Sequence, residues 1–115
     1  MPLLKLCTSI DVPKETQQAL LAEMSTILAT AIGKPEQYCM AVLDHGEIIM
    51  AGKAGPAAFA DVRSIGGLNG KVNREVSKRL CALLKDRLGI SPERVYINFT
   101  DVAASNWGWN GQTFG

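Results

Sequence analysis

The sequence has no excess of charge of either sign. Its 12 Lys and Arg residues and 11 Asp and Glu residues leave a formal net charge of +1, and the two signs are interspersed along the chain. Nucleic acids and anionic membranes attract proteins that gather positive charge on one face. We therefore expect neither a nucleic acid nor a membrane as a partner.

Long hydrophobic runs are also missing. The apolar stretch at the N-terminus is interrupted by Lys5 and Asp11 before the core of a signal peptide could form. No other run approaches the roughly 20 apolar residues that a membrane-spanning helix requires. These observations predict a cytoplasmic protein without a signal peptide.

Cysteine and histidine are scarce. The three cysteines, Cys7, Cys39 and Cys81, are odd in number, lie in apolar segments and show no spacing typical of metal ligands. We expect reduced core thiols, and neither a metal nor a cofactor. The single histidine, His45, precedes Gly46 in a predicted hairpin or loop. Because it has no placed partner, we exclude it from the site.

The chain does contain enough apolar material for one core. Its 115 residues are 47% hydrophobic and 20% charged, a composition that is ordinary for a globular protein and too apolar for disorder. Two cores could not be built from so short a chain. We predict a single domain over residues 1–115.

The chain divides into two halves that repeat one pattern. Each half has a short apolar run typical of a buried strand, then a helical pattern, then a second apolar run. Gly33 and Gly89 end the two helical patterns, and a proline follows each within a few residues. The expected strands cover residues 3–9, 38–43, 58–64 and 95–101. The apolar face of the first helix consists of Leu20, Leu21, Met24, Ile27, Leu28, Ala31 and Ile32. The apolar face of the second helix consists of Val72, Val76, Leu80, Leu83, Leu84 and Leu88.

Two β-α-β units of similar length predict an α/β fold. Right-handed crossovers would place both helices on one face of a four-stranded sheet. The expected strands are nearly continuous apolar runs, which indicates that the other face is covered as well. Because the chain has no third layer, we expect copies of the same chain to cover that face and to pair the sheet edges. The tail after Asp101 is aromatic, short and Gly-rich, and we expect it to dock on a neighbouring copy.

Pro2 is the residue that most directly suggests chemistry. If Met1 is removed, the terminus becomes a secondary amine held in a ring that fixes the direction of its lone pair. An α-amino group titrates near about 8, so desolvation or a nearby cation can leave it neutral and basic at neutral pH. The alternative is that Pro2 only suits Met1 removal or begins an edge strand.

Several segments carry a resemblance to a known family. They are MP followed by a strand, GKPEQY after the first helix, RSIGG before the second, ISPERVYINFTD, and the tail NWGWNGQTF. In order and spacing, from end to end, the sequence resembles the family of macrophage migration inhibitory factor and D-dopachrome tautomerase. The resemblance implies a homotrimer with active sites between adjacent subunits. It also implies keto-enol tautomerisation of 2-oxo acids such as phenylpyruvate, with this small molecule as the substrate.

The resemblance also implies roles for individual residues. Pro2 matches the catalytic general base, and Lys34 matches the lysine that meets the substrate carboxylate and favours the unprotonated amine. Ile65 matches a position whose backbone amide hydrogen-bonds the substrate. Tyr96 and Asn98 match a polar pair supplied by the adjacent subunit, and their spacing of two places both side chains on one face of a strand.

The aromatic tail resembles the family's substrate walls. Trp109 and Phe114 match apolar walls that hold an aromatic ring. Trp107 stands where animal members have a smaller apolar residue, so we expect it to alter which substrates fit at the pocket mouth and to disfavour dopachrome-type activity. Residues 57–60 read Ala-Ala-Phe-Ala where vertebrate members have CxxC, and we expect no thiol oxidoreductase activity.

Other interpretations remain open. Lys34 is favourable at a helix C-terminus in any case, Tyr96 and Asn98 could form a half-exposed strand face, and the aromatic residues could be interface packing. The chain could be a signalling or binding protein with a vestigial pocket, as the family's cytokine role in animals suggests. It could also hydrate or decarboxylate a related acid, chemistry that the wider superfamily achieves with added arginines and a carboxylate that activates water. No residue is clearly placed for that chemistry, and only Arg63 and Arg94 are left open.

Overall fold

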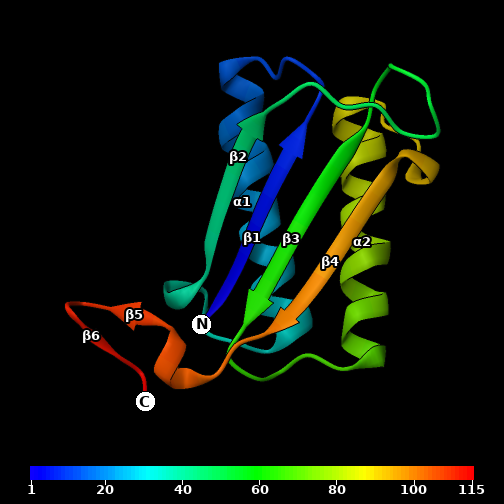
Figure 1. Cartoon of the computed structure of the whole chain (residues 1–115). Helices are drawn as coiled ribbons and strands as arrows, with labels where there is room; N and C mark the ends of the chain where they lie inside the picture. Colours follow the sequence, from blue (N-terminus) through cyan, green and yellow to red (C-terminus); the bar gives the residue numbers. More distant parts are fainter.

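The computed structural model describes all residues, 1–115. Figure 1 shows a sheet with both helices on one of its faces and a small hairpin beyond one end of it. The elements in chain order are β1 (Pro2–Thr8), α1 (Lys14–Ile32), β2 (Met40–His45), β3 (Ala58–Ser64), α2 (Gly70–Leu88), β4 (Val95–Asp101), β5 (Gly108–Trp109) and β6 (Gln112–Thr113), with short 3-10 helices at Glu36–Tyr38, Pro92–Arg94 and Ala104–Asn106.

The main sheet joins the two halves of the chain through its central strands. Its order is β2-β1-β3-β4. β1 pairs in parallel with β2, and β3 pairs in parallel with β4, whereas β1 and β3 are antiparallel. Each half is therefore one β-α-β unit, and the two units meet along the β1–β3 pair. This arrangement confirms the predicted fold class of two repeats and a four-stranded sheet with two helices on one face.

The helices form where the apolar spacing predicts them. In α1 the buried residues recur every four positions, from Leu20 through Met24 and Leu28 to Ile32, which places them on one face. Gly33 ends the helix in the left-handed region at φ 78°, and its N–H donates to the Ala29 carbonyl.

The second helix has a cap at each end. The Asn69 side-chain oxygen accepts a hydrogen bond from the Val72 N–H at 2.9 Å, which satisfies one of the free donors of the first turn. Gly89 ends α2 at φ 68°, as Gly33 ends α1. Its buried face consists of Val76, Leu80, Leu83 and Leu84.

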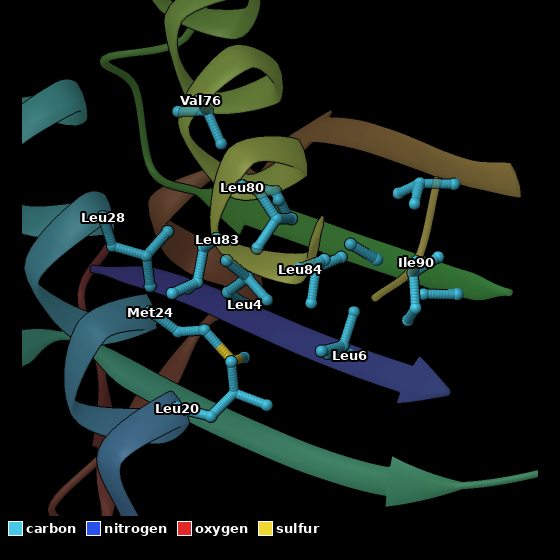
Figure 2. Packing of buried hydrophobic residues seen from close by; sticks show 14 of the residues in the cluster. Leu4, Leu6, Leu20, Met24, Leu28, Val76, Leu80, Leu83, Leu84 and Ile90 are labelled. Atoms are coloured by element: carbon cyan, nitrogen blue, oxygen red, sulfur yellow. The ribbon is translucent and has the colours of Figure 1, made fainter. Parts of the chain in front are cut away.

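The core lies between the sheet and the helices. Leu4 and Leu6 of β1 are fully buried and point from the centre of the sheet toward both helices (Figure 2). Figure 2 shows them facing Leu20, Met24 and Leu28 of α1 and Leu80, Leu83 and Leu84 of α2. The same strand order that builds this core also brings the beginnings of β1 and β2 together at one end of the sheet.

The opposite face of the sheet is open in the protomer. Burial alternates strictly along β1 and β3, so the strands that read as continuous apolar runs are buried in the protomer on one side only. Met40 is 61% exposed, Phe59 41% and Tyr96 68%. Exposed apolar side chains at this density mark an interaction surface. That other copies cover it stays a prediction.

Three local expectations need correction. The second strand begins at Met40 rather than Tyr38, because Pro35 starts a 3-10 turn over Glu36–Tyr38 before the pairing of Met40 with Leu3 begins. His45 is the last residue of β2 and does not lie in a loop. The three cysteines are free but half-buried rather than core residues. No helix is long and apolar enough to cross a membrane.

Candidate active site

A pocket of about 390 Å³ opens where the chain begins. It lies at the end of the sheet where β1 and β2 start, beside the C-terminal hairpin of β5 and β6 (Figure 1). Three segments far apart in the sequence therefore build it. Its walls are mostly hydrophobic and come from Met1, Pro2 and Leu3, from residues 37–40, and from Trp107, Gly108, Trp109 and Phe114.

The chain terminus lies in an electrostatic environment that favours a neutral amine. Pro2 is fully buried, and the amine of the unprocessed chain belongs to Met1, which lines the pocket. Partial burial lowers the pKa of this amine, and the Lys34 ammonium lowers it further, whereas the Cys39 thiol acts in the opposite direction. A lowered pKa increases the unprotonated fraction at neutral pH.

Lys34 is positioned by the end of α1. It follows Gly33, whose left-handed backbone turns the chain out of the helix. Gly67 lies against this corner with φ +80°, and a Cβ at Gly67 would meet Ile32 Cγ2 at 2.9 Å and Lys34 Cε at 3.2 Å. Only glycine lets the loop approach so closely, so the RSIGG segment supports the stem of Lys34.

Ile65 lies next to the terminus. Ser64 is the direct partner of Pro2 in the β1–β3 pair, and Ile65 follows it at the end of β3. The turn is fixed from both sides, because Ser64 Oγ donates to the Gly66 carbonyl at 2.7 Å and the Asp101 carboxylate accepts from the Gly66 N–H at 2.9 Å. The structure therefore places Ile65 beside Pro2 along the strand pair, although Ile65 is not among the residues that line the pocket.

The aromatic residues of the tail pack together above the terminus. The rings of Trp109 and Phe114 stack with centroids 5.8 Å apart, and Tyr38 meets Trp109 edge to face at 6.0 Å. The Phe114 N–H donates to the Trp107 carbonyl at 3.2 Å and closes the hairpin. The tail thus contacts its own chain, and its expected docking on a neighbouring copy stays a prediction. Trp107, Trp109 and Phe114 all line the pocket.

The wall of the pocket formed by residues 37–40 is not predicted by the sequence. Gln37, Tyr38, Cys39 and Met40 line the pocket, whereas the apolar run that begins at Tyr38 predicts a buried strand. The available signal was Pro35, since a proline directly after a helix end favours a turn before the next strand. Burial raises the pKa of the Cys39 thiol, which keeps it protonated beside the amine.

Tyr96 and Asn98 do not reach the pocket of their own chain. Tyr96 pairs with Phe59, which pairs with Cys7, five positions along β1 from Pro2. At about 3.3 Å per residue along a strand and about 4.8 Å between strands, the backbone of Tyr96 lies about 19 Å from that of Pro2, and that of Asn98 about 14 Å. Both side chains are exposed on the open face of the sheet, where another copy could contact them.

The two candidate arginines have other partners. Arg94 donates to the carbonyls of Pro56 at 2.8 Å, Lys53 at 2.9 Å and Met50 at 3.3 Å. It therefore closes the loop between β2 and β3, at the end of the sheet opposite the pocket (Figure 1). Arg63 pairs with Asp61 on the open face at 3.1 Å. Neither arginine lines the pocket, and no group of three His, Cys, Asp or Glu side chains could hold a metal ion.

The fold and the site together define a class of small α/β proteins. In this class two β-α-β units share one sheet, and the chain terminus opens into an apolar pocket closed by the C-terminal tail. The chain belongs to the macrophage migration inhibitory factor family, whose family model matches residues 1–115. Membership of this family supports a tautomerase-type, isomerase function.

Individual relatives agree with this assignment. Macrophage migration inhibitory factor of Meriones unguiculatus is 45% identical over 106 residues, covering 90% of this chain and 92% of the relative. The crystal structure of a macrophage migration inhibitory factor-like protein from Entamoeba histolytica matches with a TM-score of 0.94 and 35% identity, covering 98% of each chain. A homologue from Prochlorococcus marinus matches with a TM-score of 0.93 and 39% identity over 98% of this chain and 99% of that one.

Proposed function

We propose that the chain catalyses keto-enol tautomerisation of phenylpyruvate-like 2-oxo acids, with the amine of Pro2 as general base after Met1 is removed. The observation that carries the proposal is the pocket at the terminus. It combines apolar aromatic walls with an environment that, in the unprocessed chain, lowers the pKa of the Met1 amine through burial and the Lys34 cation. A base that is neutral near the working pH is what proton abstraction requires.

The proposed reaction moves one proton between two atoms of the substrate. The neutral Pro2 amine takes a proton from the carbon beside the carbonyl, and the electron pair of the broken C–H bond forms the enolate. The resulting ammonium then gives a proton to the enolate oxygen, which yields the enol and restores the base. The burial and the Lys34 cation that lower the pKa of the Met1 amine would act in the same direction on the Pro2 ammonium after processing, which favours the return step.

Different residues bind the carboxylate and the aromatic ring of the substrate. The carboxylate meets Lys34, and the flat ring lies against Trp109, Phe114 and Tyr38, whose stacked and edge-to-face arrangement leaves planar apolar surface. The backbone amide of Ile65 donates to the bound acid. Trp107 limits the width of the pocket mouth.

The site is completed by a neighbouring subunit of a homotrimer. Tyr96 and Asn98 of one copy reach the terminus of the next, because the register separates them from Pro2 of their own chain. The same contact covers the exposed Met40 and Phe59. A closed ring also removes the free sheet edges.

The role of the terminal amine is tested by substituting Pro2 alone. Pro2→Ala is expected to lower kcat/KM for phenylpyruvate by about 100-fold, since general base catalysis typically contributes that much or more. Ultraviolet absorbance follows the loss of the enol, and intact mass confirms removal of Met1. Pro13→Ala is the matched control, because Pro13 precedes α1 at the other end of the sheet (Figure 1). An undiminished rate in Pro2→Ala removes the amine from the mechanism.

A further inference from the structure

A second cavity adjoins the pocket of the terminal amine. This distal pocket has a volume of about 270 Å³. It shares Leu3, Trp107 and Gly108 with the first pocket, so Trp107 stands between the two cavities as a partition. The remaining lining residues are Arg63, Val102 and Asn106.

Arg63 brings a positive charge close to the reacting end of the chain. It lies directly opposite Leu3 in the β1–β3 pair, one position from the pair of Pro2 and Ser64. With about 3.3 Å per residue and about 5 Å between opposed Cα atoms, its Cα lies about 6 Å from that of Pro2. The burial pattern of β3 places its side chain on the open face of the sheet. Arg63 is therefore a second cation at the end of the sheet where the chain begins, in addition to Lys34, whose charge acts on the terminal amine.

Asp61 orients the guanidinium of Arg63 but does not occupy all of its hydrogen-bond donors. Nε donates to both carboxylate oxygens of Asp61, at 3.2 and 3.3 Å, and Nη2 donates to one of them at 3.1 Å. Nη1 has no partner in the protomer. A guanidinium can bind one carboxylate along one edge and a second along another, because its donors lie in a rigid plane. Asp61 fixes that plane, and the unused donors remain for a ligand of the distal pocket.

We propose that the distal pocket is a second anion subsite, in which Arg63 selects 2-oxo acids that carry another carboxylate at the end remote from the 2-oxo group. The inference rests on the proposed function, since it assumes that the first pocket holds the 2-oxo acid. Lys34 then meets the first carboxylate, the apolar walls hold the middle of the molecule, and the remote carboxylate passes Trp107 to Arg63. Arg63 does not strengthen the binding of a substrate that lacks the second carboxylate.

The kinetic test compares two ligands of the same shape and different charge. We use 4-carboxyphenylpyruvate and its neutral amide, 4-carbamoylphenylpyruvate, and measure the ratio of their kcat/KM values. The acid is expected to be favoured about 10-fold, because Arg63 already pairs with Asp61 and offers the ligand only part of its charge. Arg63→Gln should bring the ratio close to 1. Arg79→Gln is the matched control, since it breaks a comparable exposed pair with Glu75 on α2, and it should leave the ratio unchanged.

A binding measurement separates this inference from the proposed reaction. The ligands are 3-(4-carboxyphenyl)propionate and its carbamoyl analogue, which lack the 2-oxo group, and tryptophan fluorescence reports their Kd values. A tenfold preference for the acid that Arg63→Gln removes supports the subsite even if phenylpyruvate is not turned over. A ratio near 1 in the unchanged protein, or a preference that survives Arg63→Gln, overturns the subsite even if phenylpyruvate is a good substrate.

Discussion

Sharing of the site between chains can be tested by mixing two inactive variants. Pro2→Ala removes the base, and Asn98→Ala removes a polar group that the register places about 14 Å from the base of its own chain. If each site takes Pro2 from one subunit and Asn98 from the next, a mixed trimer contains some sites in which both residues are intact. If the site lies within one chain, no such site can form.

The expected recovery follows from counting mixed rings. When equal amounts of the two variants associate at random, about three quarters of the trimers contain both kinds of chain, and each of these has one intact site in three. About one quarter of all sites should therefore be unaltered, and activity should return to about 25% of the unchanged protein. The two unmixed variants should each stay near their own low rates.

The assay is phenylpyruvate tautomerisation after co-expression of the two variants with different affinity tags placed in the loop between β2 and β3. Selecting first one tag and then the other isolates the mixed rings, in which one site in three should be active. Light scattering reports the assembly state of each sample. Activity of the mixed rings that does not exceed the mean of the two separate variants refutes the shared site, and a monomeric mass refutes the ring itself.

Three further predictions concern residues around the same pocket. Lys34→Ala raises the pKa of the terminal amine, so the rise of kcat/KM with pH moves to higher pH, and an unmoved profile contradicts the electrostatic role of Lys34. Gly67→Ala should lower the free energy of unfolding by about 2–4 kcal/mol, because the new Cβ is strained at positive φ and clashes with Ile32. Gly33→Ala has the same backbone strain but open space around the Cβ, so it should cost only about 1 kcal/mol. Equal losses of stability in urea unfolding would show that the clash with Ile32 does not occur. Trp107→Val removes the partition and should raise kcat/KM for 2-naphthylpyruvate relative to phenylpyruvate, and unchanged specificity would place Trp107 outside the path of the substrate.

Local sequence signals predicted the elements whose ends are set by backbone chemistry. The strands at residues 58–64 and 95–101 have the predicted bounds, and Gly33 and Gly89 end the helices because each adopts a left-handed conformation. The spacing of Tyr96 and Asn98 correctly placed both on one strand face, because side-chain direction alternates along any strand.

Features that depend on pairing and on the path of the tail could not be predicted. The beginning of β2 is set by its register with β1, and an apolar run by itself contains no information about that register. For this reason the apolar pattern predicts a strand at Tyr38 and Cys39, where the structure has a pocket wall. The distal pocket is lined by Trp107 together with Leu3 and Arg63, and these positions are too distant in the sequence for any local pattern to reveal that they share a cavity.

The pocket brings the second residue of the chain against the second-to-last, since Pro2 and Phe114 line the same cavity. Because Phe114 is synthesised long after Pro2, the nascent chain cannot form this cavity until most of the domain has been made. The loop between β2 and β3, at the far end of the molecule (Figure 1), is the place where a fluorescent reporter or a purification handle would leave the pocket unobstructed.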